Sequence, residues 1–73
     1  MLNFNIKSIE FIKNHLPEES QKTIFSAKTT NEVLDILSEW IDLCEECWEE
    51  NGEDYSDLGR QAQHVYDDIY LNN

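Results

Sequence analysis

The sequence predicts a small all-α domain of four helices, and three observations support this fold class. Apolar residues recur at intervals of three and four along most of the chain, which is the period of an amphipathic helix. Residues typical of helix ends separate these segments, and only residues 2–6 alternate as a strand would, with no second strand to pair with. At 73 residues the chain fits one domain, over residues 1–73, with the thin stability margin of a small core.

Two short helices are expected near the N-terminus. Ser8 is a suitable N-cap for the first helix, which ends before Pro17 because the residue before a proline disfavours the helical conformation. Pro17 then opens a second helix that reaches about residue 27. Residues 2–6 form either an early start of the first helix or an extended arm that packs Leu2, Phe4 and Ile6 on the core.

A long central helix is expected over about residues 30–51. Thr29 and Glu32 match a capping box, in which the two side chains satisfy backbone amides at a helix start. Asn51 and Gly52 supply the stop, because both accept the left-handed conformation that closes helices. The apolar face is two stripes wide, so we expect neighbouring helices on both sides of it. The stripes are Leu34, Leu37, Ile41, Cys44 and Trp48, beside Val33, Ile36, Trp40, Leu43 and Cys47.

The last helix is expected over about residues 55–71, with Asp54 or Ser56 as its N-cap. Gly59 lies inside this segment, where glycine costs about 1 kcal/mol relative to alanine. We therefore expect Gly59 to permit the close approach of a neighbouring helix. The inner face of this last helix carries Leu58, Ala62, Val65 and Ile69.

The charge distribution limits the kinds of partner. Sixteen acidic and five basic residues give a net charge of −11. Residues 1–28 hold three acids and four bases, whereas residues 29–73 hold thirteen acids and one base. Such an excess of negative charge repels nucleic acid and anionic membrane, so we expect no direct binding to either. The sequence shows neither a long apolar run nor a secretory signal, which predicts a cytoplasmic protein with reduced thiols.

A stripe of carboxylates on the outer face of the long helix is the strongest functional signal. Its members are spaced by three and four, and no lysine or arginine is interleaved to offset their repulsion. A stripe made of carboxylates alone predicts binding to a basic surface of a partner protein. The alternative is a helix face that is merely solvated. The stripe is Glu32, Asp35, Glu39, Asp42, Glu46, Glu49 and Glu53, widened by Asp54, Asp57, Asp67 and Asp68 if the last helix folds back alongside.

Motifs for catalysis or metal binding are weak. Cys44 and Cys47 have the C-x-x-C spacing of redox motifs and of half a zinc site. A position within a helix, amid carboxylates, argues against a redox pair. A zinc site needs four ligands, and the chain adds only His15 and His64, in separate helices. We therefore expect both thiols to pack in the core. His64 with Asp67 and Asp68 is an unspecific metal pattern, and no nucleophile elbow, P-loop or dinucleotide fingerprint occurs. The sequence therefore predicts no enzyme, no cofactor and no metal site.

The sequence thus predicts a non-enzymatic acidic interaction module. Its expected role is that of an inhibitor and nucleic-acid mimic, which occupies a nucleic-acid-binding or toxin surface of a basic protein partner. In size and charge the chain resembles the small acidic helical inhibitors of phages and mobile elements, a resemblance to a class only. Two alternatives remain: a homodimeric assembly module with a solvated acidic face, and a metal-binding regulator that uses Cys44 and Cys47. Tyr66 and Tyr70 are candidate anchors for a partner or a dimer seam.

Overall fold

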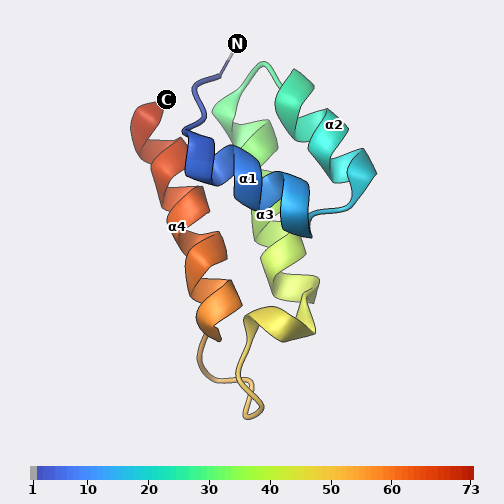
Figure 1. Ribbon diagram of the computed structural model, residues 1–73, viewed down its shortest axis with the longest axis vertical. Helices are drawn as coiled ribbons and strands as arrows, with labels where there is room; N and C mark the ends of the chain where they lie inside the picture. The colour runs from blue at the N-terminus through green and yellow to red at the C-terminus, as the bar shows by residue number, and fades with distance from the viewer. Residues whose placement is uncertain (1) are drawn as a thin grey trace.

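The computed structural model describes residues 2–73, which form four α-helices (Figure 1). The helices are α1 (Ile6–His15), α2 (Glu18–Ser26), α3 (Thr30–Leu43) and α4 (Asp57–Asn72), and a 3-10 turn, η1 (Glu45–Cys47), follows α3. α3 and α4 pack along the long axis of the molecule, and α1 packs on α4 while α2 packs on α3 (Figure 1). The predicted all-α class with four helices is confirmed, and residues 2–73 contain no strand.

One hydrophobic cluster joins the four helices. Each helix contributes a side chain that is at most 1% exposed, namely Ile12, Ile24, Leu37 and Ile69. Burying a side chain of this size is worth roughly 1.5–3 kcal/mol, so each helix contributes to the stability of the shared core. Further members of the cluster, all of them predicted on the apolar helix faces, include Val33, Leu34, Ile41, Cys47, Ala62 and Val65.

α1 begins earlier than a Ser8 cap predicts. Asn5 is the N-cap, and its Oδ1 accepts a hydrogen bond from the Ser8 amide at 2.7 Å. The Ser8 side chain is buried, and within residues 2–73 its hydroxyl has no hydrogen-bond partner. The early helix start is thus confirmed, and residues 2–5 precede it as an extended arm. Ile6 is 74% exposed and not on the core, because its place in a helix changes the side-chain period from two to 3.6.

The other helix starts agree with the sequence. Pro17 directly precedes α2, one residue before its predicted place inside the helix. At α3 the Thr29 hydroxyl accepts a hydrogen bond from the Glu32 amide at 3.4 Å, which is one of the two bonds of the predicted capping box. At α4 the Ser56 hydroxyl accepts one from the Gly59 amide at 3.2 Å. Ser56 is therefore the cap of α4, as one of the two predicted alternatives.

α3 ends at Leu43, and the predicted continuation to residue 51 is wrong. A helix over residues 30–51 would be about 33 Å long and would extend past α4, which is about 24 Å long. It would also carry several glutamates at the negative end of the helix dipole. The chain instead turns through η1, which buries Cys47 completely. The Trp48 indole N–H donates to the Ile41 carbonyl at 2.9 Å and so satisfies a carbonyl freed by the helix end.

A hairpin between Trp48 and Tyr55 stands where the end of the long helix was expected. These two residues form an isolated antiparallel bridge, and their rings stack with centroids 4.6 Å apart. The Glu49 amide donates to the Asp54 carbonyl at 2.9 Å. Gly52 has a φ of 71° in the turn between them. The predicted left-handed glycine is therefore present, but it closes a hairpin and not a helix.

Gly59 permits a close contact between α4 and η1. A Cβ atom at this position would overlap the Cys47 carbonyl oxygen and would lie 3.0 Å from the Tyr55 ring. The Ser56 amide donates to the same Cys47 carbonyl at 2.9 Å, and the Ser56 hydroxyl donates to the Glu46 carbonyl. The predicted close approach at Gly59 is confirmed, with a 3-10 turn as the neighbour.

The variant Gly59→Ala tests this contact. In an unobstructed helix the change would stabilise the protein by about 1 kcal/mol. Here we expect the overlap with η1 to lower the free energy of unfolding by roughly 1–3 kcal/mol, as measured by urea denaturation followed by circular dichroism. The control Arg60→Ala changes the exposed neighbouring residue and should stay within about 0.5 kcal/mol of the parent. A Gly59→Ala protein as stable as the parent would contradict the contact.

Candidate protein interface

Four of the predicted carboxylates form one exposed face of α3. Their spacing of three and four residues places them opposite the buried positions Val33, Leu37 and Ile41. None of them takes part in the one ion pair found among residues 2–73, which joins Lys22 to Glu18 at 3.9 Å. This acidic face of α3 is Glu32, Asp35, Glu39 and Asp42.

Carboxylates are densest at the end of the molecule formed by η1, the hairpin and the start of α4 (Figure 1). No lysine or arginine occurs between residues 42 and 57, and every acidic side chain in this range is exposed. We refer to these residues as the acidic end. They are Asp42, Glu45, Glu46, Glu49, Glu50, Glu53, Asp54 and Asp57.

Glu45 and Glu50 belong to the acidic end, although neither is a member of the predicted stripe. On a continuous helix Glu45 would point about 100° away from Glu46, which is a member of the stripe. The end of α3 at Leu43 removes this constraint, because residues in a turn and a hairpin do not follow the helical period. The local density of acids in the sequence is the signal that would have included both residues.

The remaining predicted residues lie on α4 and do not join the acidic end. α4 starts at the acidic end and runs away from it, so its second half lies toward the opposite end (Figure 1). Asp68 faces α1 and accepts a hydrogen bond from the Asn5 side chain at 3.0 Å. Asp67 is exposed on α4. Tyr66 is half-buried against the core, whereas Tyr70 is 64% exposed.

A shallow groove of about 480 Å³ lies between the end of α3 and the hairpin. Leu43, which is 75% exposed, and the half-buried Trp48 provide its apolar surface. An apolar surface bordered by carboxylates suits a lysine or arginine, whose aliphatic stem packs on the groove while its cationic head meets the charges. The acidic residues that line the groove are Asp42, Glu45, Glu49 and Glu50.

The variant Trp48→Phe tests how the hairpin is held against α3. Phenylalanine retains a ring that can stack on Tyr55, but it leaves the Ile41 carbonyl without its donor. We expect the free energy of unfolding in urea to fall by about 1 kcal/mol. We also expect faster hydrogen exchange at the Glu49 amide, which is bonded to the Asp54 carbonyl.

The control for this experiment is Trp40→Phe. Trp40 packs edge to face on Phe11, with ring centroids 5.9 Å apart, and does not contribute to the hairpin bridge. The control should leave the exchange rate of the Glu49 amide unchanged. Equal acceleration in both variants would show that the indole hydrogen bond does not hold the hairpin.

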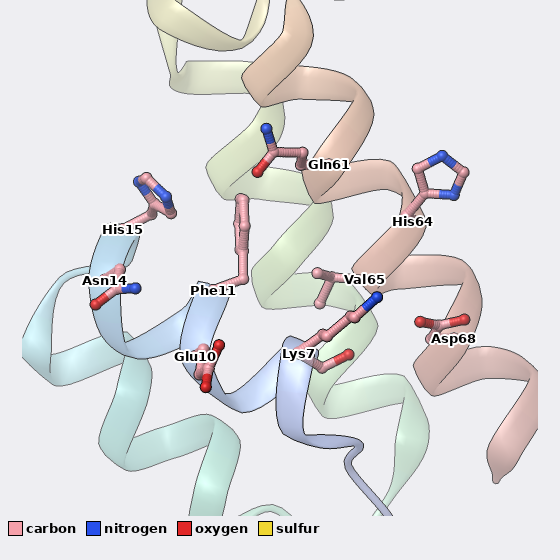
Figure 2. Close-up of a pocket in the computed structure, with 10 residues that line it drawn as sticks. Lys7, Glu10, Phe11, Asn14, His15, Gln61, His64, Val65 and Asp68 are labelled. Atoms are coloured by element: carbon pink, nitrogen blue, oxygen red, sulfur yellow. The ribbon is translucent and has the colours of Figure 1, made fainter.

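A second groove, of about 560 Å³, lies between α1 and α4 (Figure 2). Phe11 and Val65 lie between the two helices, and the Lys7 side chain extends toward α4 (Figure 2). His15 and His64 belong to opposite sides of the groove and do not point toward each other (Figure 2). The groove therefore gathers both imidazoles of the chain without pairing them.

Cys44 and Cys47 are free thiols at the junction of α3 and η1. Cys47 is fully buried, and Cys44 is half-buried against the same core, so the predicted packing is confirmed. The predicted position within a helix is wrong, because Cys44 follows the last residue of α3. Burial raises the pKa of the Cys47 thiol to about 12, with further contributions from the hydrogen bond and charge of Cys44 and from the charge of Glu46.

Across residues 2–73, no three histidine, cysteine, aspartate or glutamate side chains are grouped so that they could hold a metal ion. No helix in the same range is long and apolar enough to cross a membrane. No protein-family model, curated protein or solved structure matches the chain.

Proposed function

We propose that this protein is a non-enzymatic interaction module that occupies a basic surface of a partner protein. The contact surface is the acidic end together with the adjoining acidic face of α3. The observation that supports this proposal is the concentration of exposed carboxylates, with no ion pair among them in residues 2–73, around an apolar groove. The module acts in the cytoplasm by covering the partner's basic surface, and it uses no cofactor.

The distribution of charge favours a binding role over a purely solubilising one. Like charges at helical spacing cost a few tenths of a kcal/mol per pair, and interleaved bases would remove that cost. The acidic end contains no base, although lysines are present on α1 and α2. A partner's lysines and arginines would supply the missing positive charge, and the long-range attraction would raise the rate of encounter.

The partner's chemistry follows from the same surface. Lysine and arginine clusters in proteins commonly bind nucleic-acid phosphates, so an acidic protein of this kind would compete with nucleic acid for its partner. The groove beside Leu43 and Trp48 offers an anchor for the stem of one such side chain. We therefore propose an inhibitor of a nucleic-acid-binding protein or of a toxin, of the type that phages and mobile elements encode.

A triple charge reversal, Glu39→Lys, Asp42→Lys and Glu46→Lys, tests the proposal. The immobilised protein would be used to capture proteins from a lysate of its native organism, with elution by a salt gradient and identification by mass spectrometry. We expect the parent to retain a basic protein that leaves at moderate salt, because salt screens exposed charges. With that protein purified, the triple variant should bind at least ~10-fold more weakly.

The matched control is Glu10→Lys, Glu18→Lys and Glu19→Lys. It changes the net charge by the same amount, at exposed positions on α1 and α2. The control should retain the partner, and circular dichroism should show that both variants are folded. Equal loss of binding in the two variants would show that net charge alone, and not the acidic end, determines binding. Capture of the bait alone, as a dimer in light scattering, would contradict the proposal and favour the homodimeric alternative.

A further inference from the structure

We propose that Cys44 and Cys47 form a reversible disulfide within one molecule, across the turn that follows α3. The thiols are part of neither the acidic end nor the groove beside it. The disulfide therefore does not depend on partner binding. Its ring would enclose Glu45 and Glu46, so it would lie at the base of the acidic end.

The turn places the two cysteines at the separation that a disulfide needs. The Cys47 amide donates to the Cys44 carbonyl at 3.0 Å, so the two residues are the first and fourth of a hydrogen-bonded turn. The Cα atoms at these positions of a turn are less than about 7 Å apart. Disulfides span Cα separations of roughly 4.4–6.8 Å. Both side chains pack on the same core, because Cys47 is fully buried and Cys44 is half-buried against it.

Contacts with neighbouring segments hold the backbone of this turn in place. The Cys47 carbonyl accepts a hydrogen bond from the Ser56 amide at 2.9 Å, and α4 approaches the same carbonyl closely at Gly59. On the other side, the Trp48 indole is bonded to the Ile41 carbonyl at 2.9 Å. Because the surrounding structure fixes the turn in the reduced protein, the disulfide can close by side-chain rotation alone, without the backbone strain that makes a disulfide easily reducible.

Thiol–disulfide exchange with a low-molecular-weight disulfide, RSSR, supplies the chemistry. The Cys44 thiolate, which belongs to the half-buried residue, attacks one sulfur of RSSR. The S–S bond of RSSR breaks, one RSH leaves with a proton, and a mixed disulfide remains on Cys44. The Cys47 thiolate then attacks the Cys44 sulfur and releases the second RSH. Two protein thiols are thereby oxidised and one RSSR is reduced to two RSH.

The second step is slow because Cys47 is mostly protonated. The first step lowers the Cys47 pKa in part. Burial, together with the Cys44 side chain and its charge, raises the pKa of the Cys47 thiol to about 12. Once Cys44 carries a mixed disulfide it can no longer be a thiolate, so the contribution of its charge disappears. Exchange should then proceed on the scale of minutes to hours and not seconds.

The experiment uses the full chain and 2-hydroxyethyl disulfide as the oxidant. This disulfide is neutral, so the net charge of −11 does not repel it as it would repel glutathione disulfide. After equilibration, free thiols are alkylated and the protein is digested with trypsin. Both cysteines lie in the single tryptic peptide 29–60, between Lys28 and Arg60. We expect this peptide without alkyl groups and lighter by two hydrogens, with the mixed disulfide on the order of a tenth of the protein or less.

The variants Cys47→Ser and Cys47→Ala serve as traps. Each should stop at the mixed disulfide on Cys44, and two variants are used because a hydroxyl is costly in a buried site. The Cys44→Ser variant should leave Cys47 unmodified, since its thiol is fully buried. A parent protein that also stops at the mixed disulfide, keeps two free thiols or forms a disulfide between molecules would overturn the proposal. The parent result decides the matter even if a variant fails to fold.

Discussion

The joint between η1 and the start of α4 determines how the rest of the molecule is arranged. Two consecutive carbonyls of η1, those of Glu46 and Cys47, accept hydrogen bonds from Ser56. The same serine caps α4, so one residue both starts this helix and attaches it to the end of α3. Gly59 lacks the side chain that would hold the two segments apart. From this point α4 returns along α3, and its regularly spaced apolar residues enter the core as Ala62, Val65 and Ile69.

This joint also explains why a dense group of carboxylates is tolerated. The chain between η1 and α4 is excluded from the core, apart from the stacked pair Trp48 and Tyr55. The carboxylates of the hairpin therefore stay in water and carry no desolvation cost. On a helix continued to residue 51, glutamates at this place would face the negative end of the dipole and repel one another at a fixed spacing. A short α3 with a flanking hairpin avoids both costs while keeping the charges close together.

Local signals in the sequence were sufficient for much of the fold. The N-caps Thr29 and Ser56, and the inner faces of α3 and α4, follow from side-chain chemistry and period alone. The end of α3 does not, because Cys44, Cys47 and Trp48 continue the helical period and Asn51-Gly52 is a credible stop. Only contacts outside the helical pattern, those of the Trp48 indole with Ile41 and of Cys47 with Ser56, identify Leu43 as the last helical residue. The start of α1 does not follow from local signals either, because Asn5 and Ser8 are both good cap residues. In the structure Ser8 is buried and Asn5 is the cap.

The candidate site, too, follows only in part from the sequence. Exposure of the carboxylates on α3 follows from the helical period, whereas the membership of Glu45 and Glu50 depends on where the helix ends. At the junction beside them, different parts of the structure control the position and the reactivity of the thiols. Backbone hydrogen bonds hold Cys44 and Cys47 at turn spacing, while burial and the Glu46 carboxylate disfavour the thiolate of Cys47. The backbone turn therefore sets the spacing of the two cysteines, whereas burial of Cys47 sets the reactivity of its thiol.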